Sequence, residues 1–236
     1  MVFRQQVRTI CQLHQQAFEL LSQHRLHLVS TDEMTGIQAL ERAHPTKAMR
    51  IGKVERQEFE YIRHGTQSLI ANWHIAKGQV IAPSIGGTRN EYDFANHIAN
   101  TIETDPQAGW IFIVDQLNTH KSASLVRLVA ACCKPDIDLG VKGESGVLKS
   151  MENRAAFLSD PTHRIRFVYV PKHTSWLNQI ECWFSILMRR LIKRGNFTST
   201  DDLKQQILDF INYFNQTLAK PFKWKFEGYP EVASAA

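Results

Sequence analysis

Three acidic residues stand where strands end or helices begin, which are positions that often carry chemistry. Asp115 directly follows the apolar run Trp110–Val114, Asp32 closes the first predicted strand, and Glu181 lies in the second turn of a predicted helix. In open α/β sheets, functional groups gather at strand ends and at the starts of the following helices. If the strands that end at Asp32 and Asp115 are neighbours, both aspartates project from one edge of the sheet.

Convergence of three carboxylates requires compensation, because like charges repel. Divalent cations remove this penalty, and Mg²⁺ prefers oxygen ligands while keeping positions for water and phosphate oxygens. Two such ions about 3.5–4 Å apart stabilise the attacking and leaving oxygens of an in-line phosphoryl transfer. The alternative is that each Asp is a cap or loop residue and that Glu181 is solvated. Because Glu181 lies beside Phe184 at the margin of an apolar stripe, we favour a role for it.

The elements that must position these acids follow from hydrophobic periodicity and turn residues. The pattern predicts strands that end at Asp32, within 57–82 (with turns at His64–Gly65 and Lys77–Gly78), and at 110–114 and 165–170. Residues 33–56 are expected to form an extended connection. Helices are predicted at 4–22, 91–104, 124–132, around 148–158, and at 176–193 and 201–218. This order predicts an α/β three-layer sandwich, in which helices flank a mixed central β-sheet.

Composition bounds the class of protein. The chain has 236 residues, of which 43% are hydrophobic, enough for one sizeable core. It contains no apolar run long enough for a membrane span, and its N-terminus is too polar for a signal peptide. We therefore expect a soluble, cytoplasmic protein without a membrane partner. No two of the four cysteines form a CxxC pair, which favours free thiols. The net charge of +5 permits a polyanionic partner without requiring one.

Three segments together resemble the acidic motifs of a known family. "STDEMTGIQALE", "VDQLNTHKS" and "VPKHTSWLNQIECWF" occur in this order and resemble the first, second and third acidic motifs of DDE transposases. The mariner-related bacterial insertion-sequence group (the IS six-thirty family) is the most similar group. The resemblance extends from about residue 25 to 228, and the ordered combination is more specific than any single motif.

The resemblance implies an RNase H-like fold whose catalytic, metal-binding triad is Asp32, Asp115 and Glu181. Asp32 is preferred to Glu33 because it occupies the strand-end position of the motif. Four residues match polar positions of the motifs and are expected to support the site or contact DNA: Asn118, His120, Lys121 and Asn178. His120 could equally be a hydrogen-bonding residue that stabilises its loop.

Basic residues near the third acid are candidates for contact with the DNA backbone. They are Lys172, His173, Arg189, Arg190, Lys193 and Arg194. The alternative for the last four is a solvated helix face. We favour DNA contact, because they follow the helix that carries Glu181.

The resemblance also implies the function: a transposase catalytic domain that cleaves DNA at the element's ends and joins it to target DNA. The expected cofactor is a pair of Mg²⁺ ions, with Mn²⁺ as a substitute, and a homodimer is possible. Two alternatives are an RNase H-like nuclease that does not join strands and an inactive or repurposed DNA-binding remnant. Residues 1–24 are expected to form an N-terminal helix or linker, and residues 25–236 the catalytic domain.

Two features depart from the family pattern. An insert at about 134–163 lengthens the interval between Asp115 and Glu181, and it could contact DNA, contact a second subunit or act as a flap. Family members usually carry N-terminal helix-turn-helix units, whereas about 25 residues precede the first strand here. We therefore expect the catalytic domain alone, with weak and nearly indiscriminate binding of DNA.

Overall fold

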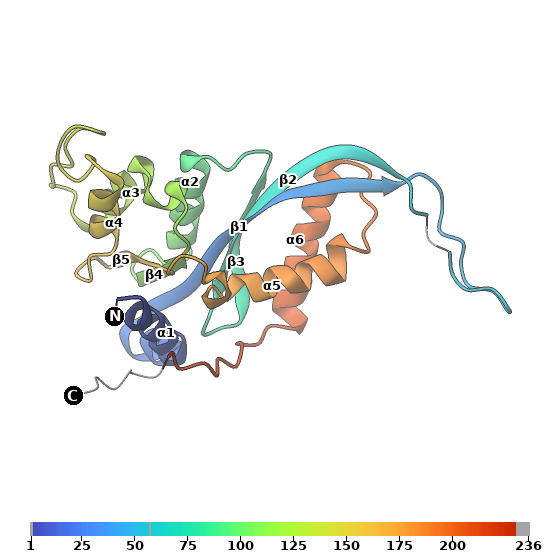
Figure 1. Ribbon diagram of the computed structural model, residues 1–236, viewed down its shortest axis with the longest axis horizontal. Coiled ribbons are helices and arrows are strands. Elements are labelled where there is room, and N and C mark those ends of the chain that lie inside the picture. Colours follow the sequence, from blue (N-terminus) through green and yellow to red (C-terminus); the bar gives the residue numbers. More distant parts are fainter. Residues whose placement is uncertain (1, 57, 230–236) are drawn as a thin grey trace, which may run out of the picture.

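A five-stranded mixed sheet forms the centre of the molecule (Figure 1). The computed structural model describes residues 2–56 and 58–229. The strands are β1 (Leu26–Arg42), β2 (Tyr61–His74), β3 (Gln79–Gly86), β4 (Gly109–Val114) and β5 (Ile165–Tyr169), in the spatial order β3-β2-β1-β4-β5. β2 and β3 pair antiparallel, as the turn at Lys77–Gly78 predicts, and β1 pairs antiparallel with β2, whereas β4 runs parallel to β1 and to β5.

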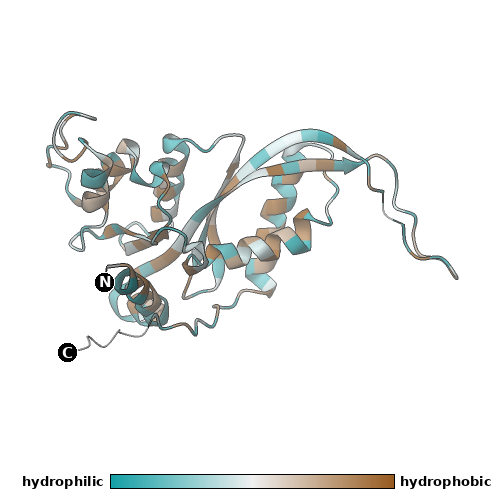
Figure 2. Cartoon of the chain, viewed as in Figure 1, coloured by the Kyte–Doolittle hydropathy of each residue, from teal (hydrophilic) through white to brown (hydrophobic). Residues whose placement is uncertain are grey.

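Helices cover both faces of the sheet and complete the predicted three layers. One face packs against α1 (Val2–His24), α5 (Ile180–Leu187) and α6 (Thr200–Thr217). The other packs against α2 (Glu91–Ile102), α3 (Ala123–Cys133) and α4 (Met151–Leu158). β4 contributes to both cores, because alternate side chains of a strand point to opposite faces. Ile111 lies in the first core and Phe112 in the second. Apolar residues follow the strands and the helices that cover them (Figure 2).

The prediction that the first strand ends at Asp32 is wrong. β1 continues for ten residues to Arg42, paired with β2, so most of the predicted connection 33–56 is strand or irregular hairpin. Its pairing register shifts between Met34 and Ile37, around Gly36 at φ 65°. Such a bulge changes which residues face the core, so the alternation that marks a strand is broken in the sequence. Beyond the bulge the alternation returns, with Ile37 and Ala39 buried.

The predicted turn at His64–Gly65 is also wrong. β2 continues through Gly65, whose φ of 122° accompanies a second register shift opposite Ala39. A glycine within a strand commonly marks a bulge of this kind. The long β1–β2 pair therefore projects from the body of the molecule, with residues 43–56 and 58–60 beyond its end (Figure 1). The turn at Lys77–Gly78 is confirmed.

Most predicted helices are confirmed, with one informative difference. The helix expected at 176–193 consists of a 3₁₀ turn (Ser175–Leu177), then α5, then a π-helical segment (Met188–Ile192). Asn178, with φ −87° and ψ 102°, separates the 3₁₀ turn from α5. α6 begins at the expected Thr198–Thr200 segment, where the Ser199 side chain accepts a hydrogen bond from the backbone N–H of Asp202. No helix in the described part of the chain has the length and apolar character needed to cross a membrane.

The insert packs on the body of the molecule. Its helix α4 contacts α3 and the 3₁₀ turn Asn118–Lys121. Arg154 Nε of α4 donates a 2.7 Å hydrogen bond to the Lys121 carbonyl oxygen, and its Nη1 donates to the Leu148 carbonyl. The insert thereby supports the loop that follows Asp115.

Candidate active site

Asp32 and Asp115 lie at the same level on neighbouring strands. β1 and β4 are parallel and adjacent, and the last pair in their register is Ser30 with Ile113. Asp32 and Asp115 each lie two residues beyond this pair. Asp32 is therefore level with Asp115 in the middle of β1, at the point where β4 stops and β1 continues.

A polar residue between the 3₁₀ turn and α5 reaches Asp32. Asn178 is fully buried, and its Nδ2 donates to the Asp32 Oδ2 at 3.2 Å and to the Thr31 carbonyl at 3.0 Å. The break in the helix at Asn178 makes this contact possible, because its backbone is extended there. Glu181 follows in the first turn of α5, and its own N–H donates to the Asn178 carbonyl.

The pKa values of the three acids show their proximity. Burial raises the pKa of Asp32 to about 7, and the charge of Asp115 adds to this rise. Burial raises the pKa of Glu181, again with a contribution from Asp115. Asp115 is therefore close enough to disfavour the ionised form of both other acids. Burial acts to raise the pKa of Asp115 as well, but hydrogen bonds from His120 and from the Leu117 N–H outweigh it and lower the pKa.

His120 joins Asp115 to a fourth acid, Glu33. Its imidazole is fully buried, with Nδ1 2.7 Å from the Asp115 Oδ1 and Nε2 3.3 Å from the Glu33 Oε1. Burial alone lowers the pKa of His120, but its hydrogen bonds to Asp115 and Glu33 raise it to about 9. The imidazolium that results at neutral pH donates from both ring nitrogens. The Leu117 N–H also donates to Asp115 Oδ1, so both contacts hold the same oxygen.

The sequence favours Asp32 over Glu33 as the first acid, whereas in the structure both contact residues of the site. Consecutive side chains of a strand point to opposite faces. Asp32 accordingly meets Asn178 beside α5, and Glu33 meets His120 beside the 3₁₀ turn. The motif "TDE" contained this signal, because two consecutive acids on a strand can serve opposite sides of one site.

The donor set suits a divalent cation. Asp32 and Glu181 both lie within the electrostatic influence of Asp115, and none of the three acids pairs with Lys or Arg among the described residues. Asp115 Oδ2 and the buried Asn178 Oδ1 have no hydrogen-bond partner in that part of the chain. Carboxylate oxygens are the protein ligands that Mg²⁺ prefers, and an amide oxygen can accept a hydrogen bond from a water that the ion keeps. As the side chains stand, no three His, Cys, Asp or Glu residues of the described chain are grouped closely enough to hold one ion together.

The remaining predicted site residues lie around this centre at different depths. Asn118 is exposed at the start of the 3₁₀ turn, whereas Lys121 is half-buried, with its Nζ 4.9 Å from the centre of the Tyr169 ring. Lys172 and His173 are exposed in the turn after β5, and the charge of Lys172 acts on Lys121. These cations therefore flank the side of the site where β4 and β5 end.

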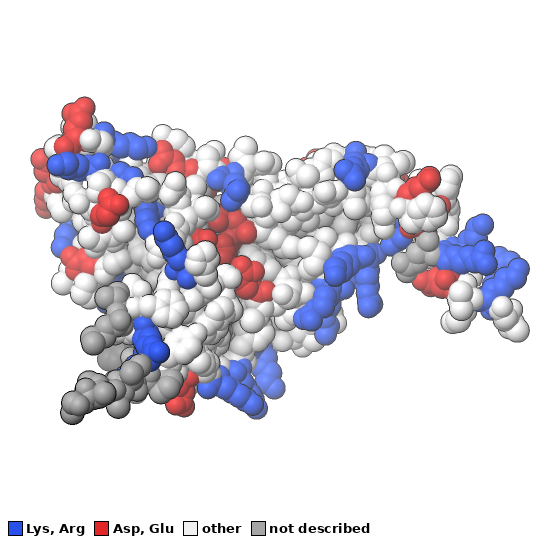
Figure 3. Space-filling model, viewed as in Figure 1, with Lys and Arg blue, Asp and Glu red and all other residues white. Residues whose placement is uncertain are grey.

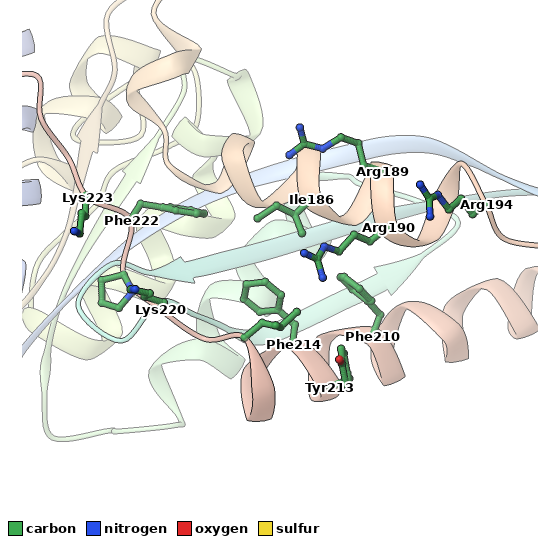
Figure 4. A pocket seen from close by; sticks show the side chains of 12 residues that line it. Ile186, Arg189, Arg190, Arg194, Phe210, Tyr213, Phe214, Lys220, Phe222 and Lys223 are labelled. Atoms are coloured by element: carbon green, nitrogen blue, oxygen red, sulfur yellow. The ribbon is translucent and has the colours of Figure 1, made fainter.

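The basic run after α5 does not share one face. Arg189, Arg190 and Arg194 line a groove between α5 and α6 (Figure 4), whereas Lys193 lines a separate cleft beside β1. Figure 3 shows acidic side chains gathered near the middle of the visible surface and basic side chains toward the projecting β1–β2 end. Acidic and basic side chains thus gather on neighbouring parts of the visible face.

Comparison with known proteins agrees with this geometry. The family model described as "DDE superfamily endonuclease" matches residues 27–204. No curated protein matches the chain. Among solved structures, a Mos1 mariner paired-end complex with Mn is similar, with a TM-score of 0.52, 12% identity and 90% of this chain covered.

The Mos1 mariner transposase catalytic domain is similar at a TM-score of 0.51 and 11% identity, over 90% of this chain and 82% of its own length. A paired-end complex with the left transposon end has a TM-score of 0.50 at 12% identity, with 90% of this chain covered. The chain spans 56% and 55% of the Mos1 chains in the two paired-end complexes. These similarities confirm the predicted RNase H-like fold.

Proposed function

The chain belongs to the DDE superfamily endonucleases, and from this premise we propose that it is the catalytic domain of a transposase that cleaves DNA and transfers the cut strand. Within that family we assign it to the mariner-related insertion-sequence group, the IS six-thirty family, on the three motifs. We assign residues 25–236 to the catalytic domain and residues 1–24 to a helix that packs on it.

One observation carries the proposal: Asp32 and Asp115 lie at one level of two parallel strands, and burial, with a contribution from the charge of Asp115, raises the pKa of Asp32 and Glu181. Buried acids with raised pKa values are typical of functional sites. A structural role alone would favour a basic partner for Asp32 and Glu181, and neither pairs with Lys or Arg among the described residues. We propose that Asp32, Asp115 and Glu181 are the catalytic and metal-binding residues.

Two Mg²⁺ or Mn²⁺ ions held by these carboxylates would activate the attacking oxygen and stabilise the leaving oxygen. The chain's own residues hold the ligands in place. Asn178 fixes one oxygen of Asp32, and His120 fixes Oδ1 of Asp115 while leaving Oδ2 available. A bound cation would favour the ionised form of Asp32, whose pKa burial raises to about 7.

Lys172 and His173, in the turn after β5, and the groove arginines, beyond the end of α5, would contact phosphates. Such contacts hold DNA in register without reading its sequence. Asn118 and Lys121, in the turn after Asp115, have the same proposed role. We retain a homodimer in the proposal, since two of the similar Mos1 structures are paired-end complexes.

The test is incubation with end-labelled DNA of the element's terminus and a target plasmid in Mg²⁺, Mn²⁺ or EDTA. Cleaved and joined products are scored separately. We expect both products with either metal and neither in EDTA. Asp115→Asn should reduce both by about a hundredfold or more, whereas Asp209→Asn on exposed α6 should not.

The alternatives give different results in the same assay. Metal-dependent cleavage without joined product would identify a nuclease that does not transfer strands. Binding of DNA without either product would identify an inactive or repurposed DNA-binding protein. Equal activity of the Asp115→Asn and Asp209→Asn variants would show that the assigned acids are not the catalytic ones.

A further inference from the structure

A groove of about 980 Å³ lies between α5 and α6, apart from the acidic residues (Figure 4). The C-terminal segment after α6 closes one end of it. The groove begins at Ile186, and Arg190 lies nine residues beyond Glu181 on the same helical segment. At 1.5 Å per residue this is roughly 14 Å along the helix axis. The groove is therefore near the acids and distinct from them.

The lining of the groove is basic. It contains five cationic side chains and no acid: Arg189, Arg190, Arg194, Lys220 and Lys223. All five are exposed, and none forms an ion pair with an acid in residues 2–56 and 58–229. Figure 4 shows the Arg190 side chain extending from the π-helical segment after α5 toward Phe214 across the groove. Unpaired cations that face one groove create a positive potential suited to a polyanion.

Aromatic side chains alternate with these cations. Phe210 and Phe214 form the floor, where both contact Trp183 of α5. Tyr213 stands at the rim with 54% of its surface exposed. Phe222 is anchored by stacking on the buried Trp73, with ring centroids 4.5 Å apart. A cationic groove with aromatic platforms is the usual design for single-stranded nucleic acid, because every base presents a stacking face.

The exposed ring at the rim selects between forms of DNA. Tyr213 is 54% exposed, and stacking on its ring requires the free face of a base, which a single strand offers and a duplex keeps inside its own base stack.

We propose that this groove binds a single-stranded segment of DNA next to the point of cleavage or joining, with Tyr213 stacking on a base and Arg190 and Arg194 contacting phosphates. This inference rests on the proposed function, since an enzyme that cuts and rejoins strands generates such segments. An acidic peptide could satisfy the charge but would not use the exposed face of Tyr213.

The test measures binding of the purified chain to a fluorescent single-stranded oligonucleotide and to the blunt duplex of the same sequence, both in EDTA. Tyr213→Ala should weaken single-strand binding by about fivefold to a hundredfold and duplex binding much less. Arg190→Gln with Arg194→Gln should flatten the plot of log affinity against log salt by about 1.4.

Matched controls come from the opposite side of the molecule. Tyr92→Ala removes an aromatic side chain that is 64% exposed on α2, and Arg127→Gln removes an exposed charge on α3. Neither should change single-strand binding by more than the error. Thermal unfolding verifies that each variant is folded.

Three outcomes would overturn the inference: equal loss in the control variants, loss confined to the duplex, or displacement of the oligonucleotide by polyglutamate at equal charge concentration. Because EDTA prevents catalysis, the binding assay is independent of the cleavage assay. If the groove variants weaken single-strand binding but the protein shows no metal-dependent cleavage, the proposed function is refuted and the groove proposal stands. If the protein cleaves DNA but the groove variants bind the single strand as well as the parent protein does, the groove proposal is refuted and the proposed function stands.

Discussion

At the scale of residues, Asp32 depends on a neutral partner where a charged one would be expected. The Asn178 amide donates to its Oδ2 inside the protein, at a position where neither side chain reaches solvent freely. An amide can hold a carboxylate in place without neutralising it. The carboxylate thus keeps its capacity to bind a cation, which a Lys or Arg partner would reduce.

The first prediction replaces this amide with its charged isostere. Asn178→Asp puts a second buried carboxylate against Asp32, and like charges in a buried site disfavour ionisation of both. We expect a loss of about 2–4 kcal/mol in the free energy of unfolding at pH 7, measured by urea denaturation. At pH 5, or with Mg²⁺ added, the difference in the free energy of unfolding between the variant and the parent protein should be smaller than at pH 7.

The matched control is Asn212→Asp, on the exposed side of α6. It introduces the same charge without burial, so its effect should remain within about 0.5 kcal/mol. Equal stabilities of the two variants would show that residue 178 does not share an electrostatic environment with Asp32.

Whether a site residue can be predicted from the sequence depends on how far along the chain its contacts lie. Asp32, Asp115 and Glu181 each stand beside a local signal, namely an apolar run or an amphipathic helix. The contact between Glu33 and His120 joins residues 87 positions apart, and no local pattern contains it. It depends on β1 and β4 being neighbours in the sheet, and the order of strands in a sheet does not follow from any local sequence pattern.

At the scale of elements, the main error concerned the length of β1. A strand is recognised by alternation, and the bulge at Gly36 shifts the alternation so that 33–42 looks aperiodic. The α/β order, the antiparallel β2–β3 pair and five of the six helices were predictable, because their apolar residues keep a constant period. The helix expected at 176–193 contains the break at Asn178, where tertiary contacts to β1 prevail over local helix propensity.

The second prediction concerns the glycine in the bulge of β2. Gly65 has φ 122°, and an added Cβ would lie 3.1 Å from Thr200 Cγ2 at the start of α6. A side chain at such a positive φ is strained whatever the space, so Gly65→Ala should cost about 1–3 kcal/mol of stability. Gly86 has no atom within 4 Å of the added Cβ and no positive φ, and Gly86→Ala serves as the control.

Chemical denaturation of both variants measures the difference. We expect Gly86→Ala to remain within about 0.5 kcal/mol of the parent protein. Equal stabilities of the two variants would mean that β2 does not bend through Gly65 and that a turn at His64–Gly65 must be reconsidered.

At the scale of the whole molecule, both cores contain histidines that burial keeps neutral. Burial lowers the pKa of His14 to about 4 and lowers those of His74 and His97 to about 3. His74 belongs to a hydrogen-bonded chain in which its Nδ1 accepts from the Lys77 N–H. Its Nε2 must then donate to His27 Nδ1, and His27 Nε2 to Asp105.

The third prediction is the pH dependence that these groups impose. Their folded pKa values are depressed below the ordinary value, so the unfolded chain binds three more protons as the pH falls below about 6.5. Asp32 acts in the opposite direction by one proton, because its folded pKa is raised. For these four groups the net difference near pH 5 is about two protons, so the free energy of unfolding should fall by about 2.7 kcal/mol per pH unit, and His27 and His163, whose pKa values burial also lowers, act in the same direction.

Urea denaturation between pH 7 and pH 4.5 gives this slope directly. His74→Gln should lower the slope by about one proton, or 1.4 kcal/mol per pH unit. His64 lies on the surface-facing part of β2, and its replacement by Gln is the control. A stability that is constant or rises toward pH 5 would contradict the neutral state of the buried histidines.

The most direct test of the central claim, that Asp32, Asp115 and Glu181 form one metal site, is anomalous diffraction from crystals grown with Mn²⁺. We predict one or two anomalous peaks among these three side chains, with Asp32 and Asp115 oxygens about 2.0–2.3 Å from a common ion. Crystals of Asp115→Asn grown in the same way should show a weaker peak or none. Peaks found only at other acids, with no ion shared by Asp32 and Asp115, would contradict the claim.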